Sequence, residues 1–151
     1  MNEFQLQVRR TFDSPREDVF EAWTSSEVMR RWLAAGRDWT TPTVEVDLRP
    51  GGRIRVSMAE TGGDPVHTFE GTYLEVAPPE RIVFTLDWQG DEADGVTSTV
   101  TVEFQEDGGR TTVVLTQTGL PSARSRDEHE DGWAKCLEGL DARVLSAAAT
   151  E

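Results

Sequence analysis

The chain has a single cysteine, Cys136, among its 151 residues. No disulfide can form within it, and nothing in the composition points to an oxidising compartment. No apolar run approaches the roughly 18 residues that a membrane-spanning helix needs. The first residues alternate polar and apolar side chains, unlike the apolar core of a signal peptide. These absences predict a cytoplasmic protein.

Basic residues are also scarce, with 15 Lys and Arg against 28 Asp and Glu and a formal net charge of −13. Such a charge repels nucleic acid and anionic membranes, so neither is expected as a partner. The chain has two histidines, His67 and His129. Neither forms a metal-ligand spacing with the other or with Cys136, and no phosphate-binding loop is present. No metal and no other cofactor is therefore expected.

The longest amphipathic segment runs from Ser125 to Ala147. Ser125 and Glu128 have the spacing of a capping box, which predicts that the helix begins at Ser125. About 23 residues at ~1.5 Å each make a rod roughly 34 Å long, enough to cross a small domain. Its apolar residues recur at helical spacing, namely Trp133, Cys136, Leu137, Leu140, Val144 and Leu145.

Most of the remaining chain alternates polar and apolar residues with the period of a strand. Strands are predicted over residues 4–12, 44–48, 54–58, 67–76, 82–88, 100–104 and 113–117. Two short helices follow the first strand, one with Ser14 as N-cap and Pro15 as first residue, the other from Glu27 to Leu33. A change of phase after Tyr73 predicts a bulge.

Short turns between consecutive strands predict an antiparallel sheet. Because apolar and polar residues alternate along the strands, one face of this sheet is apolar and must be buried against another element. Only the final helix is long enough to cover this face. The fold class is therefore α+β, with a single domain over residues 1–151 and a curved sheet of about seven strands. A curved sheet around a helix leaves a concave space of the kind in which small ligands bind.

A series of different short motifs extends through nearly the whole chain. They are Arg10–Phe12, Val19–Trp23, Arg31–Trp32, Asp47–Gly52, Phe69–Glu75, Pro78–Phe84, and His129 with Gly132–Trp133. In this order they resemble the SRPBCC superfamily of START/Bet v-like, helix-grip proteins. Within it the chain is similar to the AHSA-type branch, homologues of the C-terminal domain of an activator of the heat-shock-protein ATPase. The resemblance implies a helix-grip fold, in a superfamily that includes lipid carriers, hormone receptors and polyketide cyclases.

Two departures from the family pattern bear on function. Many relatives have a second aromatic residue after the tryptophan of the second short helix, where this chain has Leu33. The resemblance therefore implies a wider or reshaped pocket. The chaperone activator also has a separate N-terminal domain for which this chain has no room, so direct chaperone activation is not expected.

Aromatic and apolar residues of the inward phases, with two polar ones, are the candidates for ligand contact. These candidates are Trp32, Trp39, Met58, Phe69, Tyr73, Phe84, Trp88, Gln117, His129, Trp133 and Leu137. Gln117 interrupts an apolar phase and either points into the cavity or marks a strand end that reaches solvent. His129 lies one turn before Trp133 and either contacts a ligand, as a polar anchor or an acid–base group, or packs near the helix start.

Gly132 and Gly139 lie on one flank of the long helix. They predict either a close approach to the sheet or a kink that opens the cavity, because glycine destabilises a helix interior.

The sequence favours a small binding protein, monomeric or homodimeric, that holds a hydrophobic or aromatic molecule between the long helix and the sheet. Two alternatives remain open. One is a polyketide cyclase- or dehydratase-like enzyme that uses His129, Tyr73 and Gln117, although no recognisable catalytic set is present. The other is a stress-related, chaperone-associated protein.

Overall fold

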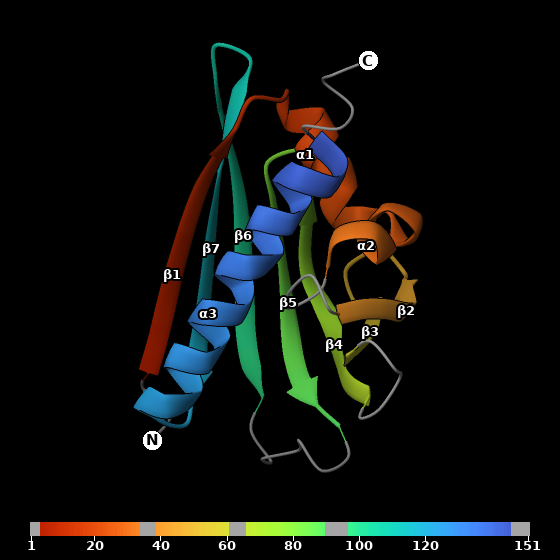
Figure 1. The fold of residues 1–151 in the computed structure, drawn as a ribbon, viewed down its shortest axis with the longest axis vertical. Coiled ribbons are helices and arrows are strands. Elements are labelled where there is room, and N and C mark those ends of the chain that lie inside the picture. Colours follow the sequence, from red (N-terminus) through yellow and green to blue (C-terminus); the bar gives the residue numbers. More distant parts are fainter. Residues whose placement is uncertain (1–3, 34–38, 61–65, 90–96, 146–151) are drawn as a thin grey trace.

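The computed structural model describes residues 4–33, 39–60, 66–89 and 97–145. It contains a seven-stranded sheet in the order β1-β7-β6-β5-β4-β3-β2, with every neighbouring pair antiparallel. The helix α3 crosses one face of this sheet diagonally (Figure 1). This is the α+β, helix-grip arrangement expected from the sequence. The strands are β1 (Phe4–Phe12), β2 (Trp39–Val46), β3 (Arg53–Glu60), β4 (Val66–Ala77), β5 (Arg81–Trp88), β6 (Ser98–Asp107) and β7 (Arg110–Leu120).

The strands from β2 to β7 follow one another as neighbours, and β1 closes the order by pairing with β7. The turn between β6 and β7 consists of Gly108 and Gly109, both at positive φ, with Asp107 paired to Arg110. Glycine adopts this backbone conformation without the steric cost of a Cβ. The bulge predicted in β4 is confirmed, because its register with β5 shifts between Tyr73 and Glu75.

The two short helices are α1 (Arg16–Thr24) and α2 (Ser26–Trp32). The prediction that the Ser14 side chain caps α1 is wrong, since α1 has no side-chain cap. The carbonyl of Pro15 accepts from the amides of Asp18 and Val19 at the helix start. Helix α2 is capped by Ser25, whose hydroxyl accepts from the Val28 amide.

Helix α3 spans Ala123–Leu140, so it begins earlier than the predicted Ser125. The cap is Ser122, whose hydroxyl accepts from the Ser125 amide at 3.0 Å. Glu128 is not part of a capping box, because its carboxylate pairs with Arg124 at 3.0 Å. A π-helical turn, η2 (Asp141–Leu145), follows α3. The predicted end at Ala147 lies outside the described residues.

The interior beneath α1 and α2 is filled with aromatic side chains. Phe20 packs edge-on against Phe104, and Trp23 packs edge-on against Trp32. Tyr73 and Phe84, paired across β4 and β5, are fully buried. No helix among the described residues is long and apolar enough to span a bilayer.

Candidate functional site

A cavity of about 500 Å³ lies between the N-terminal half of α3 and the strands β3, β4 and β5. This volume is within the range of small-molecule sites. Strand side chains and the end of α2 form one part of its wall, and α3 with the segment before it forms the other. The lining residues are Leu33, Met58, His67, Phe69, Leu86, Trp88, Pro121, Ser122, Arg124, Ser125, Glu128, His129, Gly132, Trp133 and Cys136.

One face of α3 supplies the helical wall of the cavity. Ser125, His129, Gly132 and Cys136 are spaced by four, three and four residues, the spacing that places side chains on one face of a helix. Trp133 lies beside this row and is buried. The amphipathic stripe recognised from Trp133 onward therefore extends two turns toward the helix start, where its members are polar or glycine.

Trp88 is held at the cavity wall by a hydrogen bond to α3. Its indole Nε1–H donates to His129 Nε2 at 2.9 Å. His129 Nδ1 lies 2.7 Å from the backbone carbonyl of Ser125. This carbonyl can only accept, so Nδ1 carries the proton and His129 is the neutral Nδ1–H tautomer. Both ring nitrogens are therefore engaged within the protein.

Trp133 is held in the same way from the sheet. Its Nε1–H donates to Gln117 Oε1 at 2.8 Å. Gln117 Nε2 donates in turn to Ser98 Oγ at 2.8 Å, and the hydroxyl of Ser98 donates to the Leu86 carbonyl at 3.3 Å. Gln117 is completely buried, so the interpretation that it marks a strand end reaching solvent is wrong, and it is not among the residues that line this cavity.

The structure separates the predicted ligand-contact residues into three groups. Met58, Phe69, Trp88, His129 and Trp133 line the cavity together. Trp32, Tyr73, Phe84, Gln117 and Leu137 are buried in the core and do not line it. Trp39 lies in β2, and its side chain falls outside the described residues.

The sequence analysis missed several lining residues. Leu33 was noted only as a departure from the family pattern, although its buried side chain lines the cavity. Cys136 was placed on the inward stripe but not among the ligand contacts. Ser122 and Ser125 were missed because the helix start was misplaced. Extending the helical spacing backward from Cys136 places Gly132, His129 and Ser125 on one face together.

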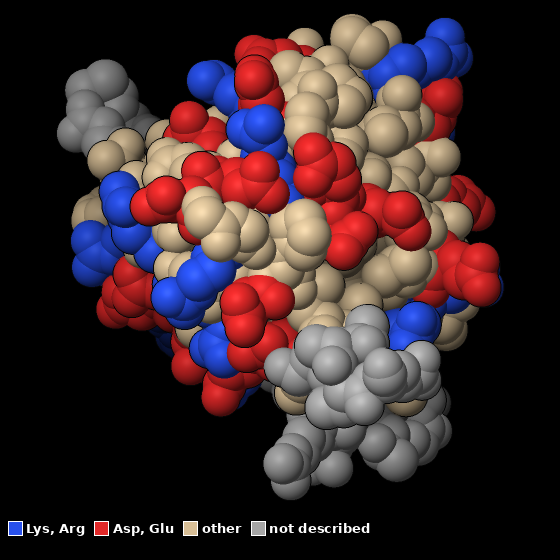
Figure 2. All heavy atoms as spheres, turned by 90° about the horizontal axis from the view of Figure 1, so that it is seen from above, with Lys and Arg blue, Asp and Glu red and all other residues tan. Residues whose placement is uncertain are grey.

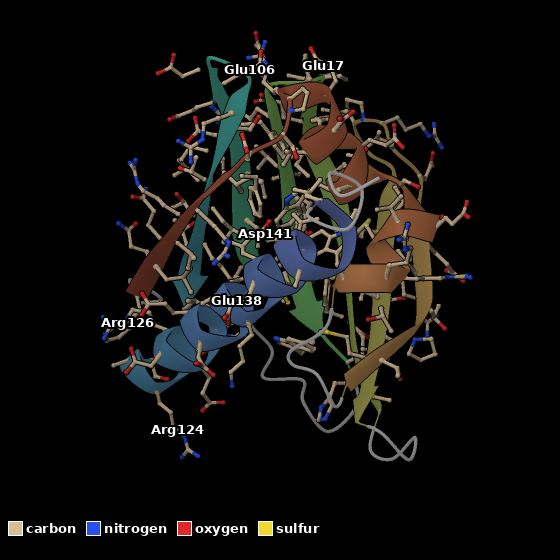
Figure 3. The ribbon with its side chains drawn as sticks, turned by 45° about the horizontal axis from the view of Figure 1, so that its top comes forward. Glu17, Glu106, Arg124, Arg126, Glu138 and Asp141 are labelled. Atoms are coloured by element: carbon tan, nitrogen blue, oxygen red, sulfur yellow. The ribbon has the colours of Figure 1, made fainter. Side chains whose placement is uncertain are left out.

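Two charged side chains at this end of α3, those of Arg124 and Glu128, lie at the edge of the cavity. Figure 3 shows Arg124 and Arg126 at the N-terminal end of the helix, directed outward, with Asp141 at its other end. The Arg124 side chain is 90% exposed and pairs with Glu128, which is 67% exposed. These two residues therefore form the rim of the cavity and carry opposite charges.

Tyr73 and Trp23 lie in the filled part of the core. Among the described residues, the Tyr73 hydroxyl and the Trp23 indole N–H have no hydrogen-bond partner. Burial raises the pKa of the Tyr73 phenol well above its ordinary value, because the charged form would lose its hydration. Tyr73 is therefore neutral at physiological pH and is poorly placed to act as a base. No group of three potential metal ligands comes together within the described residues.

Comparison with protein families shows which family the sequence matches. Residues 13–144 match the model of the family described as "Activator of Hsp90 ATPase homolog 1-like protein". The chain belongs to this AHSA1-like family. The match runs from before α1 to within η2 and thus covers every described residue that lines the cavity.

Solved structures agree with this assignment. An AHSA1-like protein from Aeromonas hydrophila is 28% identical, with a TM-score of 0.82 over 98% of this chain and 96% of that one. A Chromobacterium violaceum protein is 25% identical, with a TM-score of 0.81 over 91% and 94%. An AHSA1 protein from Silicibacter pomeroyi is 22% identical, with a TM-score of 0.83 over 98% and 100%, and shows the shared fold. Comparison with curated proteins gives no match.

In this AHSA1-like protein the two polar residues predicted to contact a ligand, His129 and Gln117, form hydrogen bonds with the tryptophans of the cavity wall. His129 and Gln117 each accept an indole N–H, one from Trp88 and one from Trp133. Held in this way, Trp88 and Trp133 line the cavity with their indole N–H groups already bonded within the protein. Of the three residues suggested for acid–base chemistry, His129 and Gln117 therefore position the tryptophans of the cavity wall.

Proposed function

We propose that this AHSA1-like protein binds a small hydrophobic or aromatic molecule in the cavity between α3 and the sheet. The observation that carries the proposal is a cavity of about 500 Å³ whose two tryptophans are fixed by hydrogen bonds within the protein. Preorganised walls lower the entropy lost when a ligand binds, because few side chains need to be ordered.

The surface charge supports a small molecule as the partner rather than a polyanion. Seen from above, acidic side chains spread across the face of the molecule (Figure 2), in line with the formal net charge of −13. Such a surface raises the free energy of approach for nucleic acid or anionic lipid. At the rim of the cavity, by contrast, the Arg124–Glu128 pair is balanced and accepts a neutral ligand.

A catalytic function has less support from the geometry. The three groups proposed for it do not converge on the cavity: Tyr73 and Gln117 lie outside its lining, and both nitrogens of His129 are bonded within the protein. A general acid or base must reach the reacting proton directly or through one water. Binding is therefore the function that the arrangement supports best.

The test is a thermal-unfolding screen against lipids, sterols and flat aromatic compounds. A ligand at a hundred times its dissociation constant should stabilise the protein by about 2.7 kcal/mol. In Leu33→Phe the added volume enters the cavity wall, so the same ligand should stabilise this variant less. Leu74→Phe is the matched control, because Leu74 is 54% exposed and lies away from the cavity. Failure of every apolar compound to stabilise the wild-type protein would overturn the proposal.

A further inference from the structure

Gly132 differs from the described glycines of the strands and turns, because neither a close contact nor its backbone conformation explains its identity. Among glycines of the strands and turns, Gly52 and Gly71 are needed because a Cβ would lie 2.0 Å from the Asp47 carbonyl oxygen and 1.7 Å from that of Thr85. Four more have positive φ, namely Gly51, Gly108, Gly109 and Gly119. Gly132 has neither constraint: it lies within α3, and a Cβ there would meet no atom of the described residues within 4 Å.

This finding argues against one of the two sequence-based interpretations of Gly132, a close approach between α3 and the sheet. Such an approach would place sheet atoms near the position of the Cβ, and no described sheet atom lies within 4 Å of it. A glycine in a helix interior costs about 1 kcal/mol relative to alanine. The chain therefore keeps a destabilising residue at a position where alanine would fit.

The position of Gly132 on the helix shows which space its missing side chain leaves open. It lies three residues after His129 and four before Cys136, both of which line the cavity, and it lines the cavity itself. Residues at these spacings share one helix face. A side chain at position 132 would therefore extend into the cavity from the middle of its helical wall.

The wall across the cavity is aromatic. Phe69 and Trp88 pack edge to face with their centroids 5.6 Å apart. Trp88 is fixed by His129, and Trp133, next to Gly132, is fixed by Gln117. Aromatic rings favour stacked or edge-on contacts with other rings, and glycine lets a ligand approach the backbone closely. Bare backbone on one side and fixed rings on the other suit a molecule that is flat.

We propose that Gly132 is a specificity-determining residue that keeps a slot open between the α3 backbone and the Phe69–Trp88 pair, so that the cavity prefers planar aromatic ligands to flexible aliphatic ones. This inference rests on the proposed binding function and names the ligand class for the same cavity.

The test compares two probes of different shape, acridine as the planar aromatic and decanol as the flexible chain, at a pH where acridine is neutral. Gly132→Ala should weaken acridine binding about fivefold and decanol binding less than twofold, because a chain can bend around one methyl group. Gly132→Leu should weaken acridine binding at least tenfold. The matched control is Ala134→Leu, which adds the same side chain on the exposed face of α3 and should leave both affinities unchanged.

Thermal unfolding shows that the variants fold, and Gly132→Ala should raise the midpoint by about 3 °C. The inference is overturned if wild-type protein binds decanol as tightly as acridine, or if the two Gly132 variants bind acridine as well as wild type does. In both cases binding itself, and with it the proposed function, still stands. If neither probe binds the wild-type protein, the inference is overturned, and the proposed function is overturned with it only if every compound of the wider thermal-unfolding screen fails as well.

Discussion

The interior of this protein has two aromatic regions that are built differently. Beneath α1 and α2, the aromatic region is filled. Trp32 donates its indole N–H to the Ala22 carbonyl, but the Tyr73 hydroxyl and the Trp23 indole have no partner among the described residues. Beneath the N-terminal half of α3, Trp88 and Trp133 border a cavity, and each indole N–H has a polar acceptor. A ring packed on all sides is held by its neighbours, whereas a ring beside a cavity lacks contacts on one side. Directional hydrogen bonds supply the missing constraint.

The largest expected effect comes from removing a ring of the filled region. Trp32 is completely buried, and its Nε1–H donates to the Ala22 carbonyl at 2.8 Å. Trp32→Ala should lower the free energy of unfolding by about 4 kcal/mol. Trp88→Ala should cost only about 2 kcal/mol, since Trp88 is half-buried and faces an existing cavity. Urea unfolding of both variants measures the difference, and equal losses would contradict the distinction between the regions.

Gln117 provides the next test, because it holds Trp133 from within the sheet. Gln117→Leu should cost about 2 kcal/mol, since it leaves the Trp133 N–H and Ser98 hydroxyl without their buried partner. With Trp133→Phe already in place, the same change should cost at least ~1 kcal/mol less. Gln105→Leu, on an exposed position of β6, is the control. Purely additive losses would show that the hydrogen bond does not position the ring.

The third test concerns Tyr73 in the filled region, whose buried hydroxyl has no hydrogen-bond partner among the described residues. Tyr73→Phe should stabilise the protein by up to about 1 kcal/mol, because a buried hydroxyl without a partner is removed. The folded-state pKa is raised, so the unfolded state loses this proton first. Stability is therefore unaffected below the ordinary tyrosine pKa of about 10 and falls as pH rises above it.

Urea unfolding at neutral and alkaline pH should show a smaller alkaline loss for Tyr73→Phe than for wild type. Tyr73 is the only tyrosine, so phenolate absorbance reports this group alone. Titration of the folded protein at the ordinary tyrosine pKa would contradict the account.

The smallest effect on stability is expected at His129. His129→Leu should cost about 0.5 kcal/mol, because Trp88 is half-buried and water can replace the lost acceptor. Its main consequence should be a freer Trp88 ring, seen as a shift and broadening of that indole N–H resonance. Ser125→Ala is the control, since it removes only the longer contact of the Ser125 hydroxyl with His129 Nδ1, at 3.4 Å, and keeps the 2.7 Å bond to the backbone carbonyl. An unchanged Trp88 resonance in His129→Leu would show that His129 does not position the ring.

The sequence predicted the order of elements, the antiparallel sheet and the bulge after Tyr73, because these depend on local alternation and turn residues. It misplaced the start of α3, because Ser122 and Ser125 are both suitable caps and only the pairing of Glu128 with Arg124 distinguishes them. For the cavity, Trp88 and Phe84 share one strand phase, yet only Trp88 lines it. Such a difference depends on where α1, α2 and α3 lie over the sheet, which periodicity along the chain does not specify.

The most direct test of the central claim follows the indole N–H resonances of the protein during titration with acridine, with assignments from single Trp→Phe variants. The account predicts that the signals of Trp88 and Trp133 shift as the cavity fills, while those of Trp23 and Trp32 stay in place. Shifts confined to Trp23 and Trp32, or no shift in any signal at saturating acridine, would contradict it.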